Sequence, residues 1–505
     1  MEAYERALAL KPDYAEGWNN RGVSLSALDR HAEALTCYAR ALEHRPGYDF
    51  LYGRWLHAKM KVCDWDGIGG DTATLESRIR RREKATPPFP LLALTDSPGL
   101  ERIAAEIWAE HQHPARMALP AIPRRGIRDK IRLGYFSADF REHACARLFV
   151  GLLEQHDRSR FEVTAFAFGP EAHDPMRRRL TAAVDRFIDV RDRSDRDVAL
   201  LARKEGVDIA VDLMGFTRFA RTDIFALRAA PMQVSFLGYP GTMGAAFIDY
   251  LIADRTLIPP ESRQHFTEAI AYLPDSYQPN DERRQMSERA FTRDELGLGH
   301  AEFVFCCFNN NYKITPATFD SWMRILREVD GSVLWLLEDN ETATRNLRHE
   351  ASRRHVSPDR LVFAPLIAPA EHLARHRAAD LFLDTLPYNA HTTASDALWA
   401  GLPVLTCRGE TFAGRVAASL LVAARLPDLV TATPDEYESV AIGLAESPER
   451  LKRLRGQLAA SRHAVPLFEI KSFARHIEAA YSAMQERYRA GLAPDVIRVK
   501  RQVGT

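Results

Sequence analysis

From residue 131 onward, short apolar segments alternate with helical stretches, and this alternation limits the possible folds of the chain more than any other feature. Three such segments, at 131–136, 161–168 and 208–213, form a first series. Strand-sized runs separated by helices are typical of parallel sheets. Five further runs form a second series, at 303–308, 332–337, 360–363, 381–384 and 403–406. The sequence therefore predicts two doubly wound, Rossmann-like domains in tandem, with ligands bound where the strand carboxyl ends face a cleft.

Composition narrows the class of protein. The chain has 505 residues, more than one hydrophobic core usually supports, and its 68 basic and 68 acidic residues cancel. A formal charge of zero removes the main electrostatic argument for nucleic acid as a partner. No apolar run approaches the roughly 20 residues that span a bilayer, and the N-terminus is charged, unlike a secretory signal. We therefore expect a soluble, cytoplasmic protein without membrane insertion.

The cysteines predict neither disulfides nor a metal centre. Six are present, and no pair has the C-x-x-C spacing of a zinc or redox motif. Their apolar surroundings are typical of reduced, buried thiols in a cytosolic protein. The lone D-x-D motif, Asp195 to Asp197, lies in the charged stretch RDRSDRD. We interpret it as a solvated loop entering a helix.

The first fifty residues contain an internal repeat. Tyr4, Ala7 and Pro12 recur 34 positions later as Tyr38, Ala41 and Pro46. This period, with small residues at helix-packing positions, is the tetratricopeptide pattern. Because about three repeats are needed for stability and this array is shorter, it docks on the adjoining part of the chain or the chain start is incomplete. Such arrays form concave peptide-binding surfaces, although these helices could also only cap the larger domain.

The remaining organisation is predicted from breaks in these patterns. Prolines 87, 88 and 90 interrupt an irregular helical stretch, which we interpret as a connector, and a polar segment near 274–299 suits a linker. The segment 472–489 is predicted to be one long helix. The predicted division is tetratricopeptide repeats 1–62, connector 63–125, N-terminal lobe 126–275, linker 276–300, C-terminal lobe 301–470, and C-terminal helix and tail 471–505.

The segment 383–406, LDTLPYNAHTTASDALWAGLPVLT, predicts a buried strand, a polar loop and a helix start. A helix N-terminus offers unpaired N–H groups and a partial positive charge, so a loop bearing Thr392 and Thr393 suits a diphosphate. The carboxylate of Asp396, one turn further on, could hold a ribose diol. Alternatively, Thr393 and Asp396 form a capping box variant that needs no ligand.

Polar residues also come directly after two other predicted strands. Asp139 and His143 are four positions apart, so they share a side if the segment is helical, and they could handle a proton. Equally, they could only cap a helix. Thr315-Pro316 marks another helix start, with Lys313 just before it. A lysine there can neutralise a phosphate leaving group, although alone it would be read as a surface lysine.

Together these segments resemble the protein O-GlcNAc transferase and SPINDLY-related glycosyltransferase family. The resemblance covers residues 1 to about 488, and it rests on the tetratricopeptide start and on several motifs in the family's order: GYFSADFREHACARLF, DLMGFTRFARTDIFALRAAPMQVSFLGYPGTMG, CCFNNNYKITPATFDSW, SVLWLLED, PLIAPAEHLARHRAADLFLDTLPYNAHTTASDALWAGLPVLT and GETFAGRVAASLL. It implies a GT-B architecture of two Rossmann-like lobes, with the nucleotide sugar held mainly by the second. It also implies metal-independent, inverting transfer to a protein side chain.

The resemblance also implies roles for individual residues. Lys313 is the expected stabiliser of the departing UDP, and Asp139 and His143 match positions near the reacting centre. The implied donor-binding residues are Asn310 at the diphosphate, His391, Thr392 and Thr393 at the phosphates, Asp396 at the ribose, Ile367, Ala368, Pro369, His372 and Arg375 around the uracil, and Leu237 and Gly238 on the sugar side.

Two departures from the family pattern affect the chemistry. A histidine that animal members carry in a Leu-Ser-His context is absent, and the corresponding region offers Thr95, Asp96 and Ser97. The base is therefore Asp139, His143 or the donor phosphate. Tyr388 replaces a family cysteine that lies near the N-acetyl group, which leaves the choice of donor sugar open.

The leading hypothesis is a protein O-linked N-acetylglucosaminyltransferase that moves GlcNAc from UDP-GlcNAc to serine or threonine. It needs no cofactor, only the nucleotide sugar and an acceptor protein or peptide, which the tetratricopeptide surface could recruit. Two alternatives remain open. One keeps the chemistry with another donor, GDP-fucose or UDP-glucose, and the other is a tetratricopeptide binding protein with vestigial catalytic lobes.

Overall fold

The computed structural model describes residues 2–114, 119–123, 126, 128–462 and 464–501. The chain forms two compact units. One contains Met1–Ala104, Met286–Ala417 and Asp428–Ala459, and the other contains Ala105–Gln285, Ala418–Pro427 and Ala460–Thr505. The helical N-terminal region therefore belongs to the same unit as the second parallel sheet. Positions 115–118 and 124–125 of the predicted connector, and 502–505 of the predicted tail, lie outside the described residues.

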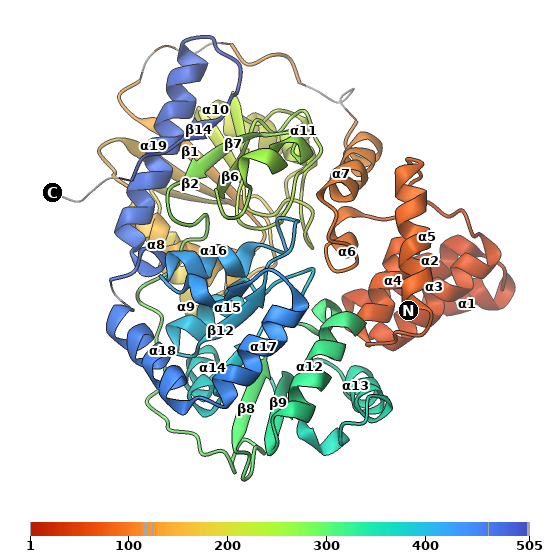
Figure 1. The fold of residues 1–505 in the computed structure, drawn as a ribbon. Coiled ribbons are helices and arrows are strands. Elements are labelled where there is room, and N and C mark those ends of the chain that lie inside the picture. Colours follow the sequence, from red (N-terminus) through yellow and green to blue (C-terminus); the bar gives the residue numbers. More distant parts are fainter. Residues whose placement is uncertain (1, 115–118, 124–125, 127, 463, 502–505) are drawn as a thin grey trace. The chain divides into compact units, whose positions relative to one another are not determined.

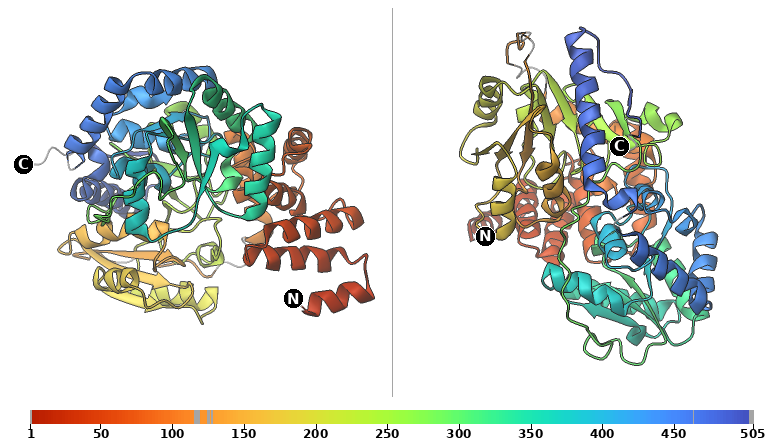
Figure 2. Two further views of the ribbon diagram at one scale, coloured as in Figure 1. Left: turned by 90° about the horizontal axis from the view of Figure 1, so that it is seen from below. Right: turned by 90° about the vertical axis from the view of Figure 1, so that its left-hand side faces the viewer.

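The chain begins with four antiparallel helices, shown in red and orange in Figures 1 and 2: α1 (Glu2–Leu10), α2 (Ala15–Ala27), α3 (His31–His44) and α4 (Leu51–Lys61). Leu25, Ala34 and Tyr38 belong to their common core. Gly22 permits the close approach of α2 and α3, because a Cβ atom there would lie 2.6 Å from the Tyr38 ring. Small residues at helix-packing positions thus have the role that the 34-residue repeat predicts.

Three more helices come next, α5 (Ile68–Arg80), α6 (Pro88–Leu91) and α7 (Pro98–Gln112). The chain between α5 and α6 runs beside α4, where Gly53 N–H donates to the carbonyl of Ala85 at 2.9 Å. The carboxyl end of α4 is satisfied by the C-terminal lobe. Asn340 Nδ2 donates to the Lys61 carbonyl at 3.0 Å, and Asn346 Nδ2 donates to the Val62 carbonyl at 2.8 Å. The short array therefore docks on the lobe that contains the second sheet, as expected for so few repeats.

The N-terminal lobe contains an eight-stranded parallel sheet in the order β14-β7-β6-β5-β4-β1-β2-β3. The three predicted strands of this lobe are present, and five others were not predicted. Strands of only two to five residues give little signal in a sequence, and those at Arg186–Asp189 and Ile497–Arg498 are also partly exposed. The strands are β1 (Ile131–Ser137), β2 (Phe161–Ala167), β3 (Arg186–Asp189), β4 (Ile209–Asp212), β5 (Met232–Ser235), β6 (Tyr250–Asp254), β7 (Ala269–Leu273) and β14 (Ile497–Arg498).

The C-terminal segment returns to this lobe. The predicted long helix is α19 (Ile470–Arg489), and β14 after it pairs with β7 in the register Ile497↔Ala271. Glu478 of α19 is buried, and its Oε1 pairs with His156 Nδ1 at 2.9 Å. Part of the predicted linker is also packed here, since buried Asp281 accepts two hydrogen bonds from Arg179. The other helices of the lobe are α8 (Ala144–Gln155), α9 (Pro175–Ala182), α10 (Asp195–Glu205), α11 (Asp223–Ala226) and η2 (Pro260–His265).

The C-terminal lobe contains a six-stranded parallel sheet in the order β10-β9-β8-β11-β12-β13. The five strands predicted for this series are all present within one residue at each end. The chain moves outward in one direction from β8 and in the other from β11, so the topological switch point lies between these two strands. The strands are β8 (Phe303–Cys307), β9 (Ser332–Leu337), β10 (Leu361–Ala364), β11 (Leu381–Leu383), β12 (Val404–Cys407) and β13 (Val430–Thr431).

Helices connect these strands, and the lobe's core includes the buried rings of Trp322 and Trp335. Short 3-10 turns also occur, and one of them, η3 (Asn311–Lys313), carries Lys313. The helices are α12 (Pro316–Glu328), α13 (Glu341–Arg353), α14 (Pro369–Arg375), α15 (Thr392–Trp399), α17 (Pro434–Ala445) and α18 (Pro448–Ser461), with η4 (Pro358–Arg360), η5 (His376–Ala378) and η6 (Pro427–Leu429). Most of α16 (Val416–Ala423) and all of η7 (Pro466–Phe468) belong to the other compact unit.

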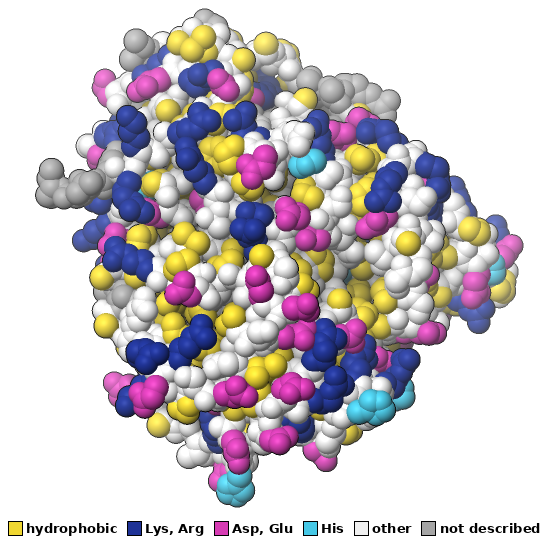
Figure 3. Space-filling model, in the orientation of Figure 1, with side chains coloured by type: hydrophobic (Ala, Val, Ile, Leu, Met, Phe, Trp, Pro, Cys, Tyr) yellow, Lys and Arg dark blue, Asp and Glu magenta, His cyan; other side chains and the backbone are white. Residues whose placement is uncertain are grey.

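The surface matches the balanced composition. On the face in Figure 3, basic and acidic side chains are interspersed. Many of them form ion pairs at the surface, such as Arg30 with Glu33 at 2.6 Å. None of the described helices combines the length and the apolar character that crossing a bilayer requires.

Candidate functional site

The switch point of the C-terminal lobe brings two polar segments together. β8 leads through Asn309 into the η3 turn that carries Lys313, and β11 leads into Asp384 and the loop before α15. Because β8 and β11 are neighbours in the sheet, their carboxyl ends lie side by side. This is the position at which open parallel sheets bind ligands.

Lys313 is buried, with 8% of its surface exposed. Its Nζ donates to the Asn389 carbonyl at 2.8 Å and lies 3.7 Å from the centre of the Tyr388 ring. Thr315 begins the next helix as predicted, since its hydroxyl accepts from Thr318 N–H and Pro316 takes the first helical position. Lys313 is therefore a buried residue with defined contacts and not a surface side chain.

Burial shifts the titration of this lysine and of a neighbouring carboxyl group. The pKa of Lys313 is lowered to about 7, chiefly by desolvation, while the charge of Asp384 opposes the shift. Burial raises the pKa of Asp384, although hydrogen bonds from Thr406 Oγ1 at 2.7 Å and Ala390 N–H at 2.6 Å favour its ionised form. A lysine so poorly solvated gains from any anion that binds beside it.

Helix α15 begins next to this lysine and carries no side-chain cap. His391 occupies the cap position without a capping hydrogen bond, and Thr392 is the first helical residue. Thr393 lies inside the helix, and its hydroxyl donates to Asn309 Oδ1. The capping-box alternative is thus wrong, because a capping hydroxyl must precede the helix. The helix start keeps its positive partial charge for a ligand.

The loop 409–414 packs against the residues that precede this helix. The Ala413 carbonyl accepts from Asn389 N–H at 3.0 Å and is 3.4 Å from His391 Nε2, which is then the donor. Asp96 holds the loop, because its Oδ1 accepts from the N–H groups of Glu410 at 2.9 Å and Thr411 at 3.1 Å. Burial lowers the pKa of His391 well below its usual value, so the ring is neutral at pH 7.

Arg375 marks a second polar feature of the lobe, near β8 and β9. Its guanidinium is buried over the Phe308 ring, 4.6 Å from the ring centre, and Nη1 donates to the Pro365 carbonyl at 2.6 Å. Among the described residues, its Nε and Nη2 atoms have no partner. Buried donors left without partners are costly, so these two atoms would be stabilised by an acceptor.

The rest of the predicted base-binding segment lies beside Arg375. The His372 ring meets Phe308 edge-on at 5.3 Å. Ala368 and Pro369 are exposed and Ile367 is half-buried, so their backbone is accessible. Asn310 is exposed and Asp396 is half-buried. The C-terminal lobe thus places all the donor residues predicted for it at or near the carboxyl edge of one sheet.

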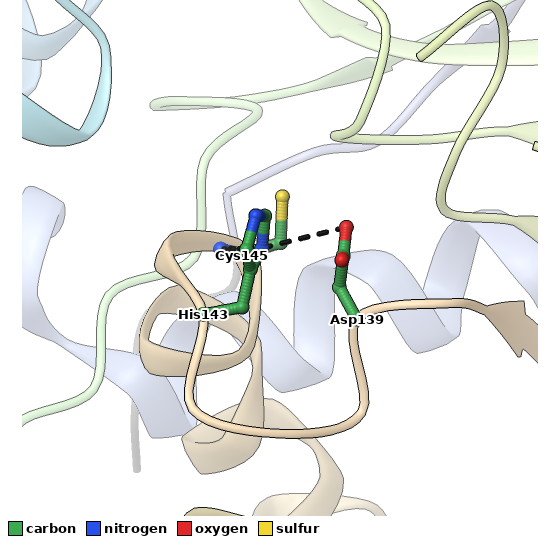
Figure 4. A group of neighbouring side chains, drawn as sticks. All are labelled: Asp139, His143 and Cys145. Atoms are coloured by element: carbon green, nitrogen blue, oxygen red, sulfur yellow. Dashed lines mark hydrogen bonds and ion pairs between the residues drawn. The ribbon is translucent and has the colours of Figure 1, made fainter. Parts of the chain in front are cut away.

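In the N-terminal lobe, Asp139 and His143 lie together, as Figure 4 shows. The segment is a loop and not the helix on which their pairing was argued, since α8 begins only at Ala144. His143 Nδ1 nonetheless lies 3.4 Å from Asp139 Oδ2, and it also accepts from Cys145 N–H at 3.3 Å. His143 therefore caps α8, as the alternative interpretation proposed, and contacts the carboxylate as well.

These groups are poorly solvated. Burial raises the pKa of Asp139 and lowers that of His143. Cys145 completes a cluster whose possible ligand atoms lie within 4.8 Å of one another. Burial raises the pKa of this thiol to about 12, which disfavours the thiolate that a metal needs. His143 Nδ1 already accepts from Cys145 N–H, so the cluster is poorly suited to a metal ion.

Leu237 and Gly238 come after β5 in a tight turn. Leu237 has φ of 68°, and a Cβ atom on Gly238 would lie 2.0 Å from the Leu213 carbonyl oxygen. Asp212, at the end of β4, was not predicted. It is buried with Oδ2 unpartnered among the described residues, and burial raises its pKa to about 6. A carboxylate at the end of an apolar strand was the signal for it.

Several C-terminal residues were also missed by the sequence argument. Asp384, Asn309 and Asn389 connect Lys313 to α15, and only Asp384 had a signal, as a carboxylate ending a buried strand. Of the residues in place of the family histidine, Thr95 donates to Glu76 at 3.0 Å and Ser97 accepts from Leu100 N–H. Tyr388, expected beside a sugar, is a buried ring beneath Lys313.

Comparison with known proteins places this geometry in context. The model of glycosyl transferase family 41 matches residues 111–291 and 281–477, and the tetratricopeptide repeat model matches residues 15–48. The probable UDP-N-acetylglucosamine–peptide N-acetylglucosaminyltransferase SEC of Arabidopsis thaliana is 32% identical over 468 residues, covering 88% of this chain and 48% of that protein. The UDP-N-acetylglucosamine–peptide N-acetylglucosaminyltransferase of Caenorhabditis elegans is 28% identical, covering 73% of this chain and 42% of that protein. The chain thus spans about half the length of these curated relatives.

A solved structure shares the fold along nearly the whole chain. It is a mutant of the Thermobaculum terrenum O-GlcNAc transferase, with a TM-score of 0.81 and 29% identity over 97% of this chain and 94% of that one. This likeness and the repeat match confirm the predicted fold class, tetratricopeptide helices followed by two Rossmann-like lobes of the GT-B type.

Proposed function

Because this chain belongs to glycosyl transferase family 41, we propose that it is a protein O-linked N-acetylglucosaminyltransferase. In this proposal it transfers GlcNAc from UDP-GlcNAc to serine or threonine side chains, with inversion and without a metal. The activities named for the relatives and for the solved structure support this choice of donor and acceptor.

One observation carries the proposal. A buried lysine, Lys313, lies at the switch point of a parallel sheet, beside a helix that starts without a side-chain cap. Both features supply positive charge where a diphosphate would lie, one as an ammonium group and the other as aligned N–H dipoles. Both also stabilise the charge that grows on UDP as the bond to the sugar breaks.

The donor would extend from this centre toward Arg375. The diphosphate contacts the N–H groups of His391, Thr392 and Thr393, with Asn310 beside it, and the ribose contacts Asp396. The unpartnered donors of Arg375 would meet the uracil or its backbone surroundings at 367–369, with His372 at its side. Leu237 and Gly238 are proposed to line the sugar.

The chemical step exchanges one bond at the anomeric carbon. The acceptor oxygen forms a bond to C1 while the bond from C1 to the phosphate oxygen breaks, and UDP leaves with the electron pair. The acceptor proton passes to a base, for which the candidates remain Asp139, His143 and a donor phosphate oxygen. Asp139 and His143 are close enough to act as a pair, since His143 Nδ1 lies 3.4 Å from Asp139 Oδ2.

The tetratricopeptide helices are proposed to contribute to acceptor recruitment. The repeat model matches residues 15–48, and such repeats form binding surfaces for peptides and proteins.

The decisive experiment compares Lys313→Ala with the wild type. We expect turnover to fall by about 10²–10³-fold while affinity for UDP falls much less, because the charge matters most as UDP departs. Lys452→Ala, an exposed lysine of α18, is the matched control and should change neither quantity. Equal losses of turnover and UDP affinity would assign Lys313 to ground-state binding instead.

Calorimetric titration distinguishes the competing functions. Tight binding of UDP and UDP-GlcNAc is expected. Binding of GDP alone would reject the donor assignment in favour of a GDP-sugar. Absence of binding to every nucleotide would favour the vestigial tetratricopeptide binding protein.

A further inference from the structure

The ammonium group of Lys313 rests on an aromatic face. Its Nζ is 3.7 Å from the centre of the Tyr388 ring, well inside the range of a cation–π contact. The Asn389 carbonyl is a second ligand of the same Nζ at 2.8 Å. The ring and the carbonyl belong to consecutive residues, so one short stretch of backbone determines where the charge lies.

Tyr388 is itself held by rings from two other segments. The Phe89 ring of α6 meets it edge-on at 6.4 Å, and the Tyr312 ring of η3 meets it edge-on at 6.1 Å. Phe89 and Tyr312 also contact each other at 6.1 Å. Tyr388 and Tyr312 are each 6% exposed, so the three rings form a closed cluster beneath the lysine.

Helix α4 of the repeat region completes the cluster. The His57 ring lies 4.9 Å from the Tyr312 ring, and Lys61 lies 5.1 Å from the same ring's centre. The carbonyls of Lys61 and Val62 are hydrogen-bonded to Asn340 and Asn346. The repeat region is thus attached to the C-terminal lobe at the turn that carries Lys313.

We propose that Tyr388 is a positioning residue for Lys313, and that α4 and α6 hold its ring in place, so that the N-terminal helical region forms part of the donor site. The proposal rests on the proposed function for the role of Lys313. It adds that the site is incomplete without residues of the N-terminal helices, and that the ring at position 388 acts through the lysine rather than on the sugar.

The charged and titratable groups around Lys313 come from several elements. Burial lowers the pKa of Lys313, and Asp384 at the end of β11 and Cys307 at the end of β8 oppose this shift. His391 at the start of α15 lies 5.1 Å from Tyr388 and is neutral, while Lys61 and His57 of α4 contact the far partner, Tyr312. Within the part of the chain that the structure describes, Tyr388 is the one ring whose face contacts the ammonium itself.

The first experiment measures the lysine without any donor. Wild type, Tyr388→Phe and Tyr388→Leu are labelled with ¹³Cε-lysine and titrated by NMR, with the Lys313 signal assigned from Lys313→Met. Tyr388→Leu removes the π face from the charged form, so the pKa of Lys313 should fall by about 0.5–1 unit. Tyr388→Phe keeps the face and should leave the titration unchanged.

Two further variants test the link to the helical region. Phe89→Leu should move the lysine titration in the same direction as Tyr388→Leu, and it serves if the latter fails to fold. Tyr52→Leu alters another ring of α4, one that contacts Trp55 outside the cluster, and should move nothing. Unchanged Lys313 titration in both Tyr388→Leu and Phe89→Leu would overturn the proposal, as would a shift in Tyr52→Leu alone.

Kinetics then separate positioning from a merely structural role. Tyr388→Leu should lower kcat more than it raises KM for UDP-GlcNAc, and adding it to Lys313→Ala should cost nothing further. Additive losses in the double variant would mean that Tyr388 acts independently of Lys313. If the wild type fails to bind UDP-GlcNAc, the proposed function fails, while the NMR titration still decides whether Tyr388 positions the lysine.

Discussion

Lys313 illustrates how a single residue acquires its chemistry from its surroundings. A lysine in water stays charged far above neutral pH, yet this one has its pKa lowered to about 7 by burial. The nearby Asp384 and the Tyr388 face favour the charged form, and desolvation outweighs them. Before a donor binds, the proposed donor site therefore contains a lysine that is only partly charged at neutral pH.

Because Lys313 is only partly charged at neutral pH, donor binding is predicted to depend on pH. The diphosphate of UDP-GlcNAc favours charged Lys313 and raises its pKa, so binding takes up a proton wherever the free lysine is neutral. Affinity should be highest below pH about 7 and fall as the pH rises, by at most about tenfold per unit. Calorimetry between pH 7 and 9, in buffers of different ionisation enthalpy, measures both effects.

Lys313→Met is the control for this prediction. Across that range Asp384 stays ionised and His391 neutral, so the variant should bind more weakly and with little pH dependence. Proton uptake that persists in Lys313→Met would assign the linkage to another group.

Among the helices, two glycines lie in opposite packing environments. Gly22 in α2 faces the Tyr38 ring, whereas Gly456 in α18 is exposed and has open space where a Cβ atom would lie. The first glycine permits helix packing, and the second only adds backbone freedom to the unfolded chain.

Alanine substitutions should therefore change stability with opposite signs. Gly22→Ala is expected to destabilise the protein by about 1–2 kcal/mol, because overpacking against Tyr38 exceeds the gain in helix propensity. Gly456→Ala is expected to stabilise it by about 0.5–1 kcal/mol. Chemical denaturation of the two variants and the wild type measures both. Equal effects of the two substitutions would contradict the close packing of α2 and α3.

Strands show which elements a sequence reveals. The five strands of the C-terminal series were predictable because each apolar run is bounded by polar loops or helix starts. In the N-terminal lobe, β5, β6 and β7 succeed one another through loops and a 3-10 turn without full helices, so no helical pattern separated them. Helix α15 shows a side-chain contact that the sequence did not reveal. The sequence suggested a capping box, and the structure instead has Thr393 donating to Asn309.

For the whole molecule, the attachment of the repeats to the C-terminal lobe has a measurable consequence. Ligand at about a hundredfold excess over Kd stabilises the state that binds it by about 2.7 kcal/mol. Because opening α4 or α6 would release the rings that hold Tyr388, saturating UDP-GlcNAc should slow hydrogen exchange in both helices as well as in α15. Helix α2 lies in the same array without contacting the cluster and is the internal control. Protection confined to α15 would contradict the coupling.

The residue sequence was sufficient to predict the class of fold and the repeat, and it singled out most of the residues that we propose for the donor site. Those features leave local signals: a period of 34, strand-sized apolar runs, and a threonine-rich loop before a helix. The resemblance to a family then ordered these signals into one function. Local pattern is enough here because strands, helices and repeats depend mainly on neighbours in the chain.

The contacts that tune the site have no such local signal. Tyr388 beneath Lys313, Phe89 beside Tyr388, and Asp96 against the loop 409–414 join residues that are 75 to about 300 positions apart in the chain. Burial, which sets the pKa of Lys313, likewise depends on everything packed around the group. Such properties arise only when distant segments meet in the folded chain, because desolvation and ring contacts act through space and not along the sequence.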